Sequence, residues 1–232
     1  MVQIQIEEVK AQIAEAANKV NRNPQDITLI AVSKTYPTSA IEEAIEVGCR
    51  DFGENHVQEL CQKIEEIHRP VNWHLIGHLQ TNKVKYIIGK TSLIHSLDRL
   101  KLAEEIEKQS AKAGVITKVL LEVNVANEAS KHGFKIEEVM SAITVISKMK
   151  HIKVEGLMTV APFVAEPEEN RAIFRKLYDL SVDIQKQKFD NISTNILSMG
   201  MSNDYKIAIE EGATMVRIGT AIFGNREYSN KN

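Results

Sequence analysis

KVLLEVNVANEASKHGFKIEEVMSAITVISKMKHIKVEGLM, residues 118–158, contains two short apolar runs separated by a stretch of helical periodicity. The runs are residues 118–124 and 153–158, and their length and content of valine and leucine predict β-strands. Residues 134–149 form one apolar stripe at helical spacing, made of Val139, Met140, Ile143, Ile146 and Met149. A strand–helix–strand unit of this kind predicts two parallel strands joined by a right-handed crossover.

The same alternation continues along the whole chain. Six further strands are expected, at residues 28–34, 51–55, 73–77, 93–97, 195–200 and 215–220. A second amphipathic helix is expected within residues 168–187, and an extra helix at about residues 3–20 precedes the first strand. Eight strands, nearly all followed by a helix, predict an α/β protein that is a single-domain (β/α)₈ TIM barrel spanning residues 1–232.

An open doubly wound sheet remains the alternative fold, because sequence does not reveal whether the sheet closes. No Gly-x-Gly-x-x-Gly motif follows the first strand, which disfavours a dinucleotide-binding fold. The barrel is therefore the favoured interpretation.

Composition excludes several functional classes. The formal net charge of −2 disfavours a nucleic-acid-binding protein that depends on a basic surface. No apolar run approaches the roughly 20 residues of a membrane-spanning helix, and the acidic, helical N-terminus does not resemble a signal peptide. Two cysteines, Cys49 and Cys61, suit a reducing compartment and are expected to be small buried apolar residues. A cytoplasmic location is therefore expected.

Polar residues gather where the predicted strands end, and these ends form the active-site face of such a barrel. Lys34 ends the first strand and Asn55 the second. The segment SMGMSN at residues 198–203 combines a glycine, hydroxyl groups and a helix start, which together favour a phosphate group. Gly219 and Thr220 repeat this pattern after the last strand. The alternative is that Ser202 or Asn203 only caps the following helix, and the two roles are compatible.

Lys34 and Arg217 form the most informative pair. Side chains alternate along a strand, so Lys34 shares a side with Ile30 and Val32. If the barrel closes, the first and eighth strands are neighbours and both cations reach one cavity. A nearby guanidinium and desolvation favour a neutral amine, which can attack an aldehyde and form a Schiff base. Pairing of Arg217 with a carboxylate such as Glu122 is the alternative for that residue.

Six segments resemble one known family. They are LIAVSKTYP (29–37), FGENHVQE (52–59), WHLIGHLQTNK (73–83), VEGLMTV (154–160), LSMGMSND (197–204) and VRIGTAIFG (216–224). On these segments the chain is identified as similar to the pyridoxal 5′-phosphate (PLP) homeostasis proteins of the YggS/PROSC type. That family resembles the barrel domain of alanine racemase.

The resemblance implies PLP as cofactor and a role for each matching residue. Lys34 is expected to be the Schiff-base lysine and Arg217 the partner of the pyridine nitrogen. Asn55 is expected beside the cofactor. The phosphate is expected at Ser202, Gly219 and Thr220, with further contacts from Ser198, Met199 and Gly200. Four other residues of the family segments receive no assigned role: His74, His78, Lys83 and Lys131. His74 suits a hydrogen-bonded position inside the barrel.

A departure from alanine racemase determines the expected function. That enzyme has a second domain that supplies a catalytic tyrosine, and this chain stops at Asn232 with no sequence left to build it. Tyr36 and Tyr205 are the candidate substitutes, but both are expected to be packing or cofactor-lining residues. An arginine facing the pyridine nitrogen discourages its protonation and weakens the ring as an electron sink.

We therefore expect a PLP-binding protein that serves intracellular PLP homeostasis and amino- and keto-acid balance. No catalytic residue and no metal ligand is assigned, and the expected partners are PLP and PLP-dependent apoenzymes. A monomer is expected, without nucleic-acid or membrane partners. The alternative is a PLP-dependent amino-acid racemase of low activity. The motifs disfavour a phosphosugar enzyme that uses Lys34 on its substrate.

Overall fold

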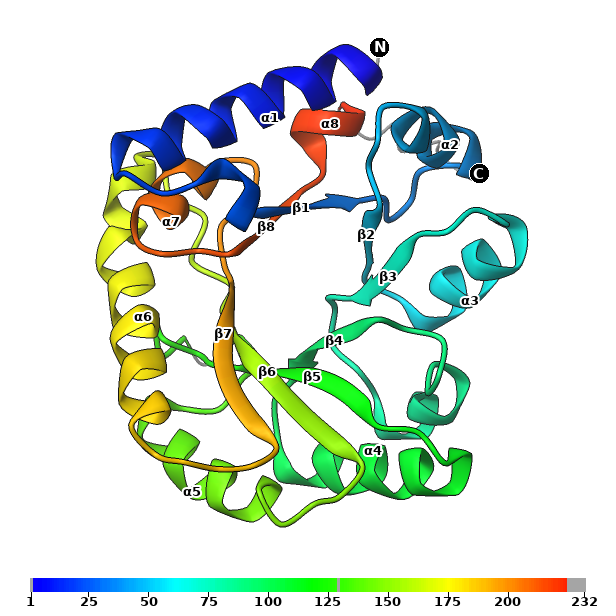
Figure 1. Ribbon diagram of the computed structural model, residues 1–232, viewed down its shortest axis with the longest axis vertical. Helices are drawn as coiled ribbons and strands as arrows, with labels where there is room; N and C mark the ends of the chain where they lie inside the picture. Colours follow the sequence, from blue (N-terminus) through cyan, green and yellow to red (C-terminus); the bar gives the residue numbers. More distant parts are fainter. Residues whose placement is uncertain (1, 129, 225–232) are drawn as a thin grey trace.

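Eight parallel strands form a closed barrel in the computed structural model, which describes residues 2–128 and 130–224 (Figure 1). Each strand pairs with the next along the chain, and β8 pairs with β1 from Thr28↔Met215 to Ala31↔Ile218. The closed barrel is confirmed, and the open sheet is excluded. The strands are β1 (Thr28–Val32), β2 (Asp51–Glu54), β3 (Asn72–Leu75), β4 (Leu93–Leu97), β5 (Thr117–Glu122), β6 (Ile152–Met158), β7 (Ile192–Ser198) and β8 (Met215–Ile218).

Helices surround the barrel. They are α1 (Val2–Lys19), α2 (Thr38–Glu46), α3 (Val57–Glu66), α4 (Leu100–Ala113), α5 (Ile136–Ile146), α6 (Arg171–Gln185), α7 (Tyr205–Glu210) and α8 (Thr220–Phe223). Between β3 and β4 the connection contains only a 3₁₀ helix, Thr81–Tyr86. The expected extra N-terminal helix is α1, which lies against α7 and α8 (Figure 1).

Several strands end earlier than the sequence predicts. β1 ends at Val32, because its pairing with β2 ends there: Ser33 N–H makes the last hydrogen bond, to Gly53 O at 3.1 Å. Lys34 therefore lies in a turn, and the next residue, Thr35, has a φ of 70°. β7 and β8 likewise end at Ser198 and Ile218, two residues before the predicted ends.

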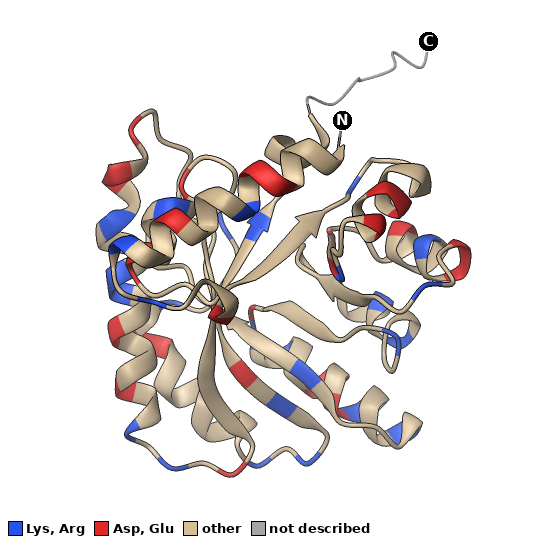
Figure 2. Cartoon of the chain, turned by 45° about the horizontal axis from the view of Figure 1, so that its top comes forward, with Lys and Arg blue, Asp and Glu red and all other residues tan. Residues whose placement is uncertain are grey.

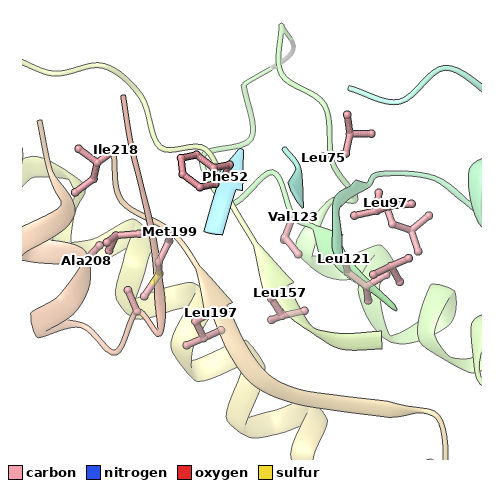
Figure 3. Close-up of a cluster of buried hydrophobic side chains, with 14 of the residues drawn as sticks. Phe52, Leu75, Leu97, Leu121, Val123, Leu157, Leu197, Met199, Ala208 and Ile218 are labelled. Atoms are coloured by element: carbon pink, nitrogen blue, oxygen red, sulfur yellow. The ribbon is translucent and has the colours of Figure 1, made fainter. Parts of the chain in front are cut away.

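Apolar side chains form two cores on opposite sides of the sheet. The larger core lies between the barrel and its helices, and Figure 3 shows part of it, including Phe52, Leu121, Leu157 and Ile218. A small cluster of Leu93, Leu120 and Met158 is separate from it. Because side chains alternate along a strand, Leu120 shares the barrel interior with Glu122, whereas Leu121 faces the helices. The interior is therefore partly polar.

Charged residues of both signs are interspersed over the helices and loops (Figure 2). This distribution agrees with the formal net charge of −2. Within the described ranges, no helix combines the length and the apolar character that crossing a membrane requires. Cys49 is buried, Cys61 is half-buried, and both are free thiols.

Candidate active site

A cavity of about 370 Å³ opens at the C-terminal ends of the strands. Six of the nine residues predicted to bind the cofactor line it together: Lys34, Asn55, Ser202, Arg217, Gly219 and Thr220. The remaining lining residues come from β1 and from the loops after β3, β6 and β7: Val32, Ile76, Val160, Pro162, Phe163, Met201, Asn203 and Asp204. Closure of β8 onto β1 brings Lys34 and Arg217 to one cavity, as the sequence predicted.

The other three predicted residues are not among the described residues that line the cavity. Ser198 is fully buried, and Met199 is fully buried in the larger core, where Figure 3 shows it. Gly200 has a φ of 90°, and a Cβ there would approach Ala208 Cβ to 2.6 Å. The absence of a side chain at Gly200 therefore lets α7 pack against the end of β7.

The turn that carries Lys34 is held on both sides of that residue. Ser33 Oγ donates to Glu54 Oε1 at 2.6 Å, and Lys63 Nζ donates to Ser33 O at 2.7 Å. Thr35 N–H donates to Glu59 Oε1 at 2.6 Å. The backbone at Lys34 is thus fixed by side chains from β2 and α3.

Lys63 joins these contacts into one network. Its amine also donates to Glu54 Oε1 at 2.8 Å and to Glu59 Oε1 at 2.7 Å. The Lys63 side chain is 6% exposed and that of Glu54 is 0% exposed, so the ion pair is shielded from water. Burial raises the pKa of Glu54, while Lys63 and Ser33 act in the opposite direction.

Arg217 extends from β8 into the barrel interior and is 4% exposed. Its NH1 donates to Ser198 Oγ at 2.7 Å and its NH2 donates to Thr159 O at 2.8 Å. Burial lowers the pKa of Arg217 to about 10, against the attraction of Asp204 and Glu122, so the guanidinium stays charged at neutral pH. Glu122, the alternative partner from the sequence, is thus coupled to Arg217 electrostatically.

A chain of hydrogen bonds continues from Arg217 through the barrel. His95 Nδ1 lies 2.9 Å from Ser198 Oγ, and His95 Nε2 lies 3.0 Å from His74 Nδ1. His74 Nε2 lies 3.1 Å from Asp51 Oδ1. His74 therefore occupies the hydrogen-bonded interior position that the sequence suggested.

Donor and acceptor roles along this chain follow from its ends. Burial, His74 and Arg217 lower the pKa of His95 well below its ordinary value, so its imidazole is neutral. Ser198 Oγ accepts from Arg217, which directs its own proton to His95 Nδ1. His95 Nε2–H then donates to His74, and His74 Nε2–H donates to the Asp51 carboxylate. Each group in this series therefore donates to the next one, from the Arg217 guanidinium at one end to the Asp51 carboxylate at the other.

Glu122 is the last residue of β5 and lies close enough to Arg217 to interact with it electrostatically. Burial, reinforced by the charge of Asp98, raises the pKa of Glu122 to about 7, although Arg217 lowers it. Near neutral pH this carboxyl group is therefore only partly ionised.

The loops after β6 and β7 are tied together at the cavity rim. Asn203 Nδ2 donates to Val164 O at 3.0 Å. Asp204, rather than Ser202 or Asn203, is the N-cap residue of α7. Its Oδ1 accepts from Met201 N–H at 2.7 Å, in the loop before the helix, and makes no hydrogen bond to the first turn of α7. The Ser202 side chain is thus available to the cavity that it lines.

Neither candidate tyrosine is among the described residues that line the cavity. Tyr36 donates to Gly224 O at 2.6 Å and stacks on Phe223. Tyr205 is 4% exposed and donates to Gln12 Oε1 at 2.6 Å, against α1. Both have the packing role that was expected.

Lys131, Lys83 and His78 lie near the cavity edge. Lys131 Nζ donates to Val160 O at 3.2 Å, and Val160 lines the cavity. Lys83 and His78 line a neighbouring hollow together with Asn55.

Several supporting residues have no role predicted from the sequence: Ser33, Glu54, Glu59, Lys63, His95 and Thr159. Glu59 and Lys63 were detectable, since their spacing of four residues places them on one face of a helix. The contact between His95 and Ser198 joins β4 to β7 and has no local sequence signal.

Comparison with known proteins identifies the family. The alanine racemase N-terminal domain model matches residues 4–227. A pyridoxal phosphate homeostasis protein of Aquifex aeolicus is 44% identical over 221 residues, covering 95% of this chain and 96% of the relative. One of Escherichia coli is 38% identical and covers 97% and 96%. The chain belongs to the pyridoxal phosphate homeostasis protein family.

Solved structures agree with this assignment. The structure of PipY of Synechococcus elongatus with PLP bound is similar to that of this protein, with a TM-score of 0.80 at 34% identity. The match covers 91% of this chain and 100% of PipY. An alanine racemase of Clostridium difficile has a TM-score of 0.72 at 15% identity, covering 98% of this chain and 57% of the racemase. This second likeness concerns the fold alone.

Removal of the Lys63 amine is expected to destabilise the protein strongly. Lys63→Ala leaves the buried Glu54 carboxylate without its counter-charge, which costs about 3–5 kcal/mol of unfolding free energy. Lys186→Ala removes an exposed ion pair to Asp183 and is the matched control, with an expected cost below about 1 kcal/mol. Denaturant titration measures both, and equal costs would contradict the structural role of the network.

Glu122→Gln is expected to gain stability relative to the unsubstituted protein as pH rises. The folded-state pKa of Glu122 is raised from 4.5 to about 7, so its stabilising contribution is present in acid and lost across that interval. Above pH 7 the unfolding free energy of Glu122→Gln, relative to that of the unsubstituted protein, is expected to be about 3 kcal/mol higher than in acid. Urea denaturation at several pH values measures it.

Glu107→Gln provides the control of opposite sign. Hydrogen bonds from His151 and Lys150 lower the pKa of Glu107, although burial opposes them, so this carboxylate stabilises the protein above its unfolded-state pKa. That variant should lose relative stability as pH rises. The same pH trend in both variants would contradict the electrostatic account.

Proposed function

We propose that this protein binds PLP in the cavity at the barrel mouth and serves PLP homeostasis by holding the cofactor reversibly. The observation that carries the proposal is the shared cavity of Lys34 and Arg217. Its volume of about 370 Å³ lies in the range of small-molecule sites. The cavity offers an amine, a guanidinium and hydroxyl-bearing loops, which suit an aldehyde, a pyridine ring and a phosphate respectively.

Lys34 is the proposed covalent attachment point. Its Nζ attacks the aldehyde carbon, a C=N bond forms, and the carbonyl oxygen leaves as water. Water reverses the same step, so the attachment is also a route of release. The network of Glu54, Glu59 and Lys63 fixes the turn and thereby the direction of the lysine side chain.

Ser202, Gly219 and Thr220 are the proposed phosphate contacts, through hydroxyl groups and backbone N–H groups. Asn55 lines the cavity and is the proposed residue beside the cofactor. Ser198 supports the site indirectly, since its hydroxyl accepts from Arg217. Gly200, which lets α7 pack against the end of β7, and the buried Met199 directly precede Met201 and Ser202 of the cavity lining.

The proposed absence of turnover rests on Arg217. A permanent cation facing the pyridine nitrogen disfavours its protonation, and an unprotonated ring stabilises a carbanion poorly. Although burial lowers the pKa of Arg217 to about 10, the guanidinium stays charged at neutral pH. Tyr36 and Tyr205 both donate to protein acceptors away from the cavity.

The proposal extends to location and partners. A monomer in the cytoplasm, delivering PLP to apoenzymes, agrees with the two free thiols and with reversible attachment at Lys34. PipY, a relative of 34% identity, has a structure with PLP bound.

Lys34→Ala is expected to abolish the visible absorption of a Schiff base when purified protein is incubated with PLP, while circular dichroism stays unchanged. Lys131→Ala is the matched control, because its amine contacts Val160 at the cavity edge. This control should retain the absorption. A wild-type protein that stays colourless with PLP would overturn the proposal.

Incubation of PLP-loaded protein with single amino-acid enantiomers in deuterated water distinguishes a non-catalytic PLP-binding protein from an enzyme. We expect no α-deuterium incorporation above that of free PLP, because Arg217 weakens the ring as an electron sink. Steady exchange or racemisation, measured by mass spectrometry and chiral chromatography, would establish the low-activity racemase instead.

A further inference from the structure

Three side chains converge on the part of the barrel mouth formed by β3, β4 and β5. His78 follows β3, Asp98 follows β4 directly, and His132 lies in the loop between β5 and α5. One potential ligand atom from each lies within 4.8 Å of the other two. None of the three is among the described residues that line the proposed PLP cavity.

Asp98 is the fixed member of this cluster. Its side chain is 4% exposed, and Arg99 binds its Oδ1. The other oxygen, Oδ2, lies 2.9 Å from His78 Nδ1 and 3.8 Å from His132 Nδ1. Arg99 therefore orients the carboxylate so that Oδ2 faces both imidazoles.

The two histidines present their Nδ1 atoms to the same oxygen. Their rings stack with centroids 3.9 Å apart and an interplanar angle of 21°. The side chains are 34% and 57% exposed, so a solvated ion has access to both nitrogens.

We propose that His78, Asp98 and His132 form a binding site for a divalent transition-metal cation, with Zn²⁺ the best fit. Two imidazole nitrogens and one carboxylate oxygen are a common zinc donor set, and water supplies the fourth ligand. Tetrahedral donors at about 2.0–2.2 Å from zinc lie about 3.4 Å apart. Binding therefore requires the stacked imidazoles to turn toward each other slightly, which their exposure permits.

A second histidine–carboxylate pair shows what the cluster adds. His151 Nδ1 lies 2.9 Å from Glu107 Oε1, and its side chain is 35% exposed. The distance is the same as in the His78–Asp98 pair, and the two histidine side chains are about equally exposed. Among the described residues, however, no third donor joins His151 and Glu107. The convergence of His132 on the pair thus distinguishes a metal site from an ordinary ion pair. A bound cation joins the loop after β3 to the loop after β5.

Isothermal titration with ZnCl₂ tests the site, using tag-free, PLP-loaded full-length protein in phosphate-free buffer. We expect one zinc ion per chain, and binding at least about tenfold weaker in His132→Ala and His78→Ala. His132→Ala removes an exposed side chain, so it keeps the test valid if His78→Ala fails to fold. Acidification should weaken binding, because protonated imidazole is not a ligand.

Two controls separate the site from other zinc-binding groups. His151→Ala is expected to bind zinc as the wild type does. Lys34→Ala should also keep the zinc affinity, so failure of the PLP proposal and failure of the metal site give different results. No zinc binding by wild type, or equal affinity in wild type and His132→Ala, would overturn the proposal.

Discussion

A guanidinium buried in a barrel interior must keep its hydrogen bonds and its charge balance, because an unpaired buried ion is very costly. Arg217 meets this constraint through Ser198, the carbonyl of Thr159 and the nearby carboxyl of Glu122. Ser198 in turn requires an acceptor, and His95, His74 and Asp51 supply a continuous series of them. Much of the polar interior of the barrel thus follows from one arginine on β8.

The adjoining wall of the cavity, formed by the ends of β1 and β2, is organised by a different charge. Lys63 compensates the buried Glu54 and also binds the backbone carbonyl of Ser33. The hydrogen bond to Ser33 O therefore fixes the backbone before Lys34. Glu59, which accepts from Thr35 N–H, fixes the backbone after it. Separate networks therefore position the two basic residues that line the cavity: one inside the barrel holds Arg217, and one between β2 and α3 holds the turn that carries Lys34.

The sequence predicted the fold well, because strand and helix periodicities are local properties. It also placed Lys34 and Arg217 at one cavity, since closure makes β1 and β8 neighbours. The positions of Ser198, Met199 and Gly200 were less predictable. They depend on where β7 ends, and its pairing with β6 and β8 determines that end. The bond between His95 and Ser198 spans 103 positions, so no local pattern indicates it.

Barrel closure has a consequence for the order of events in the cell. Lys34 emerges early in synthesis, whereas Gly219 and Thr220 belong to the last segment before Gly224. A ligand that contacts both Lys34 and the Gly219–Thr220 segment can bind only after β8 has docked beside β1. Such a ligand stabilises the docked state by mass action and leaves incomplete chains unaffected. Occupancy of the cavity therefore reports that β8 has been made and has docked beside β1.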